Sequence, residues 1–496
     1  MSDSETNILT DKRLKVGSAR ILVFLLIAIL ILSLFYGALT TKLKIKRNIV
    51  LICLIAYFAF AVYRLDIFNF LMLFLFVVLV FPFSFLCQGI MGKTLRGIWL
   101  DNTLLFWPIM FFLFIGEGAL HGKLKIYKTP SDKWILLYLI VFTLSVFYAF
   151  FVVENHWINV LRDGFRFSRI IFLIYIIICV LDRKDKLARF NTFMFLLGAC
   201  FGIYGIIEYF LFPNESLQGG SIFMRTRIKT LFGHPNSYAG YLENTLPFVF
   251  AFAVFMKGNI KKFLFWGLFI ILYINMILTF SRASFLTVNF SLLIMSLIRF
   301  GKKALLFWVA IIGIFVLLGT TTPILQRQFM LFEGGSGLNE KSDIVQQSNL
   351  FRIYEYTHLI KDIKDKPLFG AGLGSKTMGM YVTLQNLGQY VRSYMPIKNM
   401  YAHHSFVLDS AGRMGIFASF LLIMVFITIF TSLYKAYRFT SDNYLKANVF
   451  GTIGSIIAFS PHQIVDNFID SNVLIYFIFV VSVGIVAWRY IYNVEE

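Results

Sequence analysis

The stretch "VLIYFIFVVSVGIVAWRYI", residues 473–491, carries a single charged side chain, Arg489. It is long enough to cross a bilayer as a helix, which takes about 20 mostly apolar residues. Similar runs recur along the 496-residue chain, which is 58% hydrophobic and only 15% charged. A soluble domain has about 25% charged residues. The sequence therefore predicts an all-α, polytopic membrane protein.

The apolar runs predict about 12–14 transmembrane helices. They lie near residues 21–39, 48–63, 67–86, 103–120, 135–153, 168–182, 192–212, 238–256, 263–280, 284–298, 304–322, 405–432, 447–460 and 473–491. On this basis the chain divides into a cytoplasmic tail (1–20), an N-terminal transmembrane bundle (21–322), a large external loop (323–404) and C-terminal transmembrane helices (405–496).

Lysine-rich loops predict the orientation, because cytoplasmic loops carry an excess of Lys and Arg. Such loops are "HGKLKIYKTPSDK" (121–133), "DRKDKLAR" (182–189), "KGNIKK" (257–262), "RFGKK" (299–303) and "KAYRFTSDNYLK" (435–446). Counting the predicted helices from these loops places the segment "KLKIKR" (42–47) on the external side, which is an exception to the rule. The net charge of +20 is explained by such loops, with anionic membrane lipid as the partner. No nucleic-acid-binding module is found.

The external loop contains a predicted amphipathic helix. From Leu350 to Ile360 the mostly apolar residues have helical spacing, Asn349 can cap the start, and Pro367 predicts the end. The glycine-rich stretch "FGAGLGS" (369–375) follows, and we expect a flexible turn there.

The external connections are rich in arginine. They hold Arg162, Arg166, Arg169, Arg225, Arg227, Arg282, Arg327, Arg352 and Arg392. The planar guanidinium suits phosphate better than an ammonium does, so this excess predicts an external phosphate or diphosphate ligand. Contacts with lipid headgroups are the alternative. They explain Arg282 poorly, because a very short turn places it at the membrane boundary, where charge is costly unless paired or bound to a ligand.

Arg225 and Arg227 precede the turn "GHPN" (233–236). Its last two residues suit a turn and a helix start, and His234 is more typical of a turn residue than of a ligand. Glu243 and Asn244 fall inside the next predicted span, where they must face protein or a water-filled cavity.

Two adjacent histidines, His403 and His404, lie at the mouth of the predicted span 405–432. Histidine can act as a base near neutral pH. The alternative is that both residues cap a helix. A metal site with His358 lacks a suitably spaced carboxylate or thiolate partner, and no geometry supports a catalytic triad using Ser405 or Asp409. No metal and no cofactor is predicted.

Four motifs together resemble the bacterial O-antigen ligase and O-antigen polymerase superfamily. His404-Ser405 is followed after nine residues by Gly415, with Leu408 in the expected apolar place, although Ser419 departs from the ligase pattern. Arg282 and Leu286 match Arg-x-x-x-Leu. The stretches "TLFGHPNSYAGYL" (230–242) and "FRIYEYTHLIKDIKDKPLFGAGLGS" (351–375), with Arg352 near its start, resemble the family's turn and outer-helix segments. The resemblance covers roughly 220–430.

The resemblance implies an inverting, metal-independent glycosyl transfer at the outer face of the cytoplasmic (inner) membrane. The donor would be an undecaprenyl-diphosphate-linked glycan and the acceptor another glycan or a lipid-linked molecule, with a chain-length regulator as a further candidate partner. His404 would be the base. The diphosphate would bind Arg282, Arg227, Arg352 and Arg225, and the supporting residues would be His403, Ser405, Asn236 and His234.

Three functions stay open at this point. A polymerase is slightly favoured over a ligase, because the external connections are large. A transporter or flippase of a lipid-linked anionic glycan is the alternative, although that class usually has inverted repeats, and none stands out here. A non-catalytic membrane scaffold would not need the external arginines.

Overall fold

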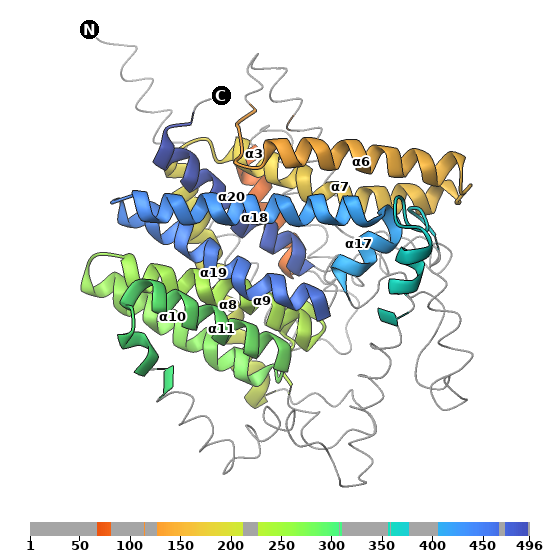
Figure 1. The fold of residues 1–496 in the computed structure, drawn as a ribbon. Helices are drawn as coiled ribbons and strands as arrows, with labels where there is room; N and C mark the ends of the chain where they lie inside the picture. Colours follow the sequence, from red (N-terminus) through yellow and green to blue (C-terminus); the bar gives the residue numbers. More distant parts are fainter. Residues whose placement is uncertain are drawn as a thin grey trace, which may run out of the picture.

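The computed structural model describes residues 67–80, 114, 126–211, 227–306, 308–309, 356–357, 359–375, 405–465 and 472–494. The helices whose bounds are fully described are eleven α-helices and one 3-10 helix, and most of them run side by side (Figure 1). They are α3 (Ile67–Val80), α6 (Asp132–Phe151), α7 (Trp157–Val180), α8 (Lys184–Leu211), η3 (Thr230–Phe232), α9 (Pro235–Phe255), α10 (Asn259–Leu278), α11 (Arg282–Phe300), α17 (Phe406–Met414), α18 (Ile416–Phe439), α19 (Asn443–Val465) and α20 (Asn472–Tyr492). The all-α prediction is confirmed.

Six of these helices are long and apolar enough to cross a membrane: α6, α8, α10, α11, α18 and α20. Several present large apolar side chains on the outside of the bundle, among them Leu136 and Phe147 of α6 and Phe263 and Ile270 of α10. In water such a surface would be unfavourable, whereas lipid tails can cover it. The chain is a multi-pass membrane protein.

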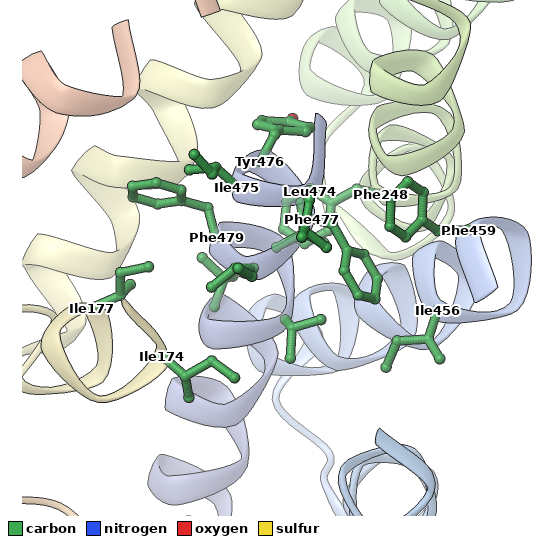
Figure 2. Close-up of a cluster of buried hydrophobic side chains, with 14 of the residues drawn as sticks. Ile174, Ile177, Phe248, Ile456, Phe459, Leu474, Ile475, Tyr476, Phe477 and Phe479 are labelled. Carbon is green, nitrogen blue, oxygen red and sulfur yellow. The ribbon is translucent and has the colours of Figure 1, made fainter. Parts of the chain in front are cut away.

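Helix α20 lies at the centre of the bundle. It contacts α7, α9, α18 and α19, and it is apolar on all sides, as expected of a fully buried helix. Figure 2 shows its side chains directed toward several neighbours, including Ile174 of α7 and Phe459 of α19. The rings of Phe459 and Phe477 are 4.4 Å apart between centroids. The apolar stretch 473–491 is therefore the core helix.

The prediction that Arg162, Arg166 and Arg169 lie in an external connection is wrong, because α7 is already helical from Trp157. Arg162, Arg166 and Arg169 are thus helical residues, and Arg169 is fully buried. These side chains lie in the interior of the protein instead of in an external loop.

The predicted single span 405–432 is also wrong in one respect, because it is two helices, α17 and α18, that meet at Gly415. The backbone there has φ +88°, and a Cβ atom would lie 1.8 Å from the carbonyl oxygen of Leu368. The next amide, Ile416 N–H, donates to the carbonyl of Pro367 at 2.9 Å. Hydropathy alone did not reveal this break, because apolar residues of the amphipathic α17 lead directly into the apolar α18.

Candidate functional site

The turn between α10 and α11 places Arg282 at the first position of α11, where the side chain is partly buried. The connection consists of residues 279–281, which confirms the predicted tight turn. Its middle residue, Phe280, is 4% exposed and has φ +52°, a left-handed conformation that is rare for a bulky side chain. Such strain persists where surrounding contacts determine the backbone, and it concentrates at functional sites.

Arg227 is hydrogen-bonded to this same turn. Its Nε atom donates to the carbonyl oxygen of Thr279 at 2.8 Å, and its Nη2 atom donates to Oδ1 of Asn236 at 2.9 Å. The backbone amide of Ile228 donates to the carbonyl of Leu278 at 3.2 Å. Two predicted site residues, Arg227 and Asn236, are therefore in direct contact at the turn that carries Arg282.

The turn before α9 has the predicted form. Gly233 adopts φ +73°, His234 is the N-cap residue and Pro235 occupies the first position of the helix, which suits its fixed φ. The Nδ1 atom of His234 accepts a hydrogen bond from the amide of Asn236 at 3.2 Å. The interpretation of His234 as a turn residue is confirmed.

Glu208 supports this region from α8 and was missed at the sequence level. Its Oε2 atom accepts hydrogen bonds from the amides of Thr230 at 2.7 Å and Lys229 at 3.2 Å. Thr230 has a left-handed backbone, with φ +48°. The carboxylate of Glu208 therefore stabilises a strained backbone between Arg227 and His234.

Ser405 is the N-cap residue of α17. Its hydroxyl accepts from the amide of Leu408 at 3.3 Å, and the residue is fully buried. The hydroxyl thus satisfies one of the backbone amides at the start of this helix. The neighbouring His403 and His404 lie outside the described residues, as do Arg225 and Arg352.

A buried cluster of charges, which we call the Asp163 cluster, connects α7 to α17. Asp163 accepts from Nη1 of Arg413 at 2.6 Å and from Nη1 of Arg166 at 3.2 Å, and Arg162 Nε lies 3.6 Å away. Arg413 also donates to Asp409 at 2.7 Å. Burial alone would lower the pKa of Arg413, but the two carboxylates raise it above its ordinary value. Arg413 thus stays charged and ties α17 to α7.

The glycine-rich segment 369–375 packs tightly against these helices, so the prediction of a flexible turn is wrong. Gly374 N–H donates to Asp163 at 2.9 Å, and Ala371 N–H donates to the carbonyl of Gly412 at 2.7 Å. At Gly370, with φ +59°, a Cβ atom would lie 2.3 Å from that same carbonyl oxygen. In Figure 1 this teal segment lies beside α17. The helix before it ends at Asp365, as Pro367 predicted.

A second buried pair of ionisable side chains joins α9 to α19. The Nδ1 atom of His462 lies 2.9 Å from each carboxylate oxygen of Glu243, and both residues are almost fully buried. Thr287 of α11 donates to the same carboxylate. Glu243 was flagged as an ionisable residue inside a span, whereas His462, beside Pro461 in an apolar run, was missed.

Comparison with known families bears on this site directly. The family model described as O-Antigen ligase matches residues 266–423. The matched stretch, about a third of the chain, is therefore similar to this family. No curated protein sequence gave a significant match. The match confirms the resemblance to the O-antigen ligase and polymerase superfamily, a family of membrane enzymes of the glycosyltransferase type.

The matched region contains most of α10, the turn with Arg282, α11, and α17 with Ser405 and Arg413. The residues that support these elements lie outside it: Arg227 contacts the turn, Asp163 contacts α17, and Glu243 and His462 contact α11. The candidate site is therefore built by the matched region together with residues of α7, α9 and α19 and the connection before α9.

Proposed function

We propose that the protein transfers a glycan from an undecaprenyl-diphosphate-linked donor to a sugar hydroxyl at the outer face of the cytoplasmic membrane. The observation that carries the proposal is the hydrogen bond from Arg227 to the turn of Arg282. The turn lies inside the region that matches the O-antigen ligase family, and Arg227 reaches it from outside that region. Two guanidinium groups at one strained, well-packed turn suit an anionic group with several oxygen atoms.

The chemistry accounts for the arginines. When the sugar–phosphate bond breaks, negative charge develops on the leaving lipid diphosphate, and preplaced cations stabilise that charge without reorganising. In the proposal Arg282 and Arg227 bind this diphosphate, together with Arg225 and Arg352. No metal is required, because the guanidinium groups supply the positive charge.

The acceptor hydroxyl needs a base, and the proposal assigns that role to His404. Attack by the deprotonated hydroxyl on the anomeric carbon, opposite the diphosphate, inverts the configuration there. The placement of Ser405 at the N-cap of α17 supports the assignment, because the Asp163 cluster fixes this helix and the chain immediately before it carries His404. His403 is assigned a supporting role.

Polymerase and ligase activities share this chemistry and differ in the acceptor. We favour a polymerase slightly, because the external connections are long. The test is the length distribution of surface and lipid-linked glycan in a deletion strain that carries either the wild-type chain or His404→Ala. If the protein is a polymerase, the deletion strain makes only single-repeat glycan. If it is a ligase, long chains accumulate on the lipid carrier in that strain.

A transporter of a lipid-linked anionic glycan is the second candidate, since external arginines would also bind its substrate. Release of undecaprenyl diphosphate separates the two classes, because a transporter leaves the sugar–phosphate bond intact. Release by the purified protein in vesicles, lost in Arg282→Ala, supports the enzyme. Movement of donor without release supports the transporter.

A further inference from the structure

Two ionisable residues of the helix bundle are not used by the proposed chemistry: Glu243 of α9 and His462 of α19. Glu243 is fully buried and His462 is 2% exposed, and the two are 2.9 Å apart. Ionisable groups inside a membrane bundle are costly and usually serve a function. Their partners show what that function is.

Both residues contact the start of α11. Thr287 Oγ1 donates to Glu243, and Ser284 Oγ lies 3.4 Å from His462 Nδ1. Ser281, the N-cap residue of α11, donates from its hydroxyl to Ser284 at 3.1 Å. A continuous chain of polar contacts thus runs from the Glu243–His462 pair to the residue before Arg282.

The opposite side of the same turn is fixed by Arg227, which donates to Thr279. Phe280, between Thr279 and Ser281, is strained, so the turn depends on its contacts on both sides. The three helices α9, α11 and α19 all contact one another. The pair therefore sits where it can set the position of the first turns of α11.

We propose that Glu243 and His462 are positioning residues for Arg282. They hold the start of α11 so that the guanidinium group of Arg282 can bind a diphosphate group. Simple stabilisation explains the pair less well, because buried polar or charged pairs are often no more stabilising than apolar residues of similar size. Hydrogen bonds are directional, so the Glu243–His462 pair can fix the orientation of α11 more narrowly than apolar packing, which is non-directional. This inference rests on the proposed diphosphate site.

A double-mutant cycle tests it with two readouts. The first is the affinity of the purified, full-length protein for inorganic diphosphate. The second is turnover of lipid-linked glycan extracted from a strain that lacks the protein. Glu243→Gln is made in the wild-type chain and in Arg282→Lys, and non-additivity measures the coupling between the two sites. His462→Gln and Thr287→Val enter the same cycle, so the test survives if one variant does not fold.

The expected result is a loss of about 10–100-fold in both readouts for Glu243→Gln, the size seen when groups that orient a ligand-binding residue are removed. In the Arg282→Lys background the same change should cost less than about 2-fold, because its effect passes through Arg282. Asn448→Ala is the matched control. Asn448 lies on α19, the helix that carries His462, and its Oδ1 atom accepts a buried hydrogen bond from Nδ2 of Asn191 at 2.6 Å. Removing this contact should leave both readouts unchanged.

Three results overturn the inference: no effect of Glu243→Gln, equal losses in both Arg282 backgrounds, or no diphosphate binding by the wild-type protein. Diphosphate binding that shows the expected coupling, without turnover of the extracted glycan, contradicts the proposed reaction but supports the positioning role. The two proposals can therefore fail separately.

Discussion

The Nε atom of Arg227 donates a hydrogen bond to the carbonyl oxygen of Thr279 over 2.8 Å. The two residues lie on different connections, one before α9 and the other between α10 and α11. A second donor of the same guanidinium is held by Asn236, so the group has a defined orientation. Arg227 thus has two roles in our account, bracing the turn of Arg282 and contributing charge to the diphosphate site.

Substitution of Arg227 should separate geometry from charge. Arg227→Lys keeps the charge but cannot reproduce two hydrogen bonds from one planar group, so we expect turnover to fall nearly as far as in Arg227→Ala. The loss should be about 100-fold, as for removal of one donor to a developing negative charge. Release of undecaprenyl diphosphate by purified protein is the measurement. Full activity of Arg227→Lys would show that charge alone is needed.

Asn236→Ala should have a smaller effect, because it removes one partner of Arg227 and leaves the bond to Thr279 in place. We expect a loss of about 10-fold or less, since one neutral partner contributes about 1 kcal/mol. The kinetic constants for the donor give the comparison. A loss as large as that of Arg227→Ala would mean that Asn236 itself contacts the substrate.

The Asp163 cluster predicts a difference between two aspartates that contact Arg413. Asp163 accepts from Arg413, Arg166 and the amide of Gly374, so Asp163→Asn leaves several buried donors with a weakened partner. We expect a loss of about 3–5 kcal/mol in the free energy of unfolding, as when one member of a buried ion pair is removed. Asp409→Asn is the comparison and should cost less. Thermal unfolding in detergent measures both, and equal melting temperatures would count against a central role for Asp163.

Gly415 should not tolerate a side chain. Its backbone, with φ +88° and ψ +164°, is essentially restricted to glycine, and a Cβ atom would meet the carbonyl of Leu368. We expect Gly415→Ala to lower the free energy of unfolding by about 1–3 kcal/mol through the backbone alone, and further through displacement of the 367–375 segment. Thermal unfolding and turnover should both be affected.

Gly267→Ala in α10 is the matched control. A Cβ atom added at Gly267 would have no heavy atom of a neighbouring element within 4 Å, and alanine favours a helix by about 0.5–1 kcal/mol over glycine. It should be neutral or slightly stabilising. If Gly415→Ala behaves like Gly267→Ala, the break between α17 and α18 does not require glycine.

Much of the fold was predictable because a membrane imposes long apolar helices, and runs such as 473–491 have few other interpretations. The tight turn at Arg282 followed from the short gap between two such runs. The break at Gly415 did not, because it depends on a backbone contact with Leu368, which is distant in sequence.

The site was predictable in part for a related reason. The arginines and the turn "GHPN" are local signals, and Arg227 and Asn236 do meet. Partners such as Asp163 with Arg413 or Glu243 with His462 come from helices far apart in the chain, and a single sequence does not reveal which buried charges pair. The prediction that Arg166 is an external residue was wrong, since it lies in α7 and contacts Asp163.

The most direct test of the account compares His404→Ala, His403→Ala and Arg282→Ala in the deletion strain and in purified form, with expression matched to wild type. The measurement is release of undecaprenyl diphosphate together with the length of the glycan product. We expect no release and no glycan extension with His404→Ala and Arg282→Ala, and residual activity with His403→Ala. A normal His404→Ala beside an inactive His403→Ala would overturn the choice of base, and unchanged release in all three variants would contradict the proposed reaction at this site.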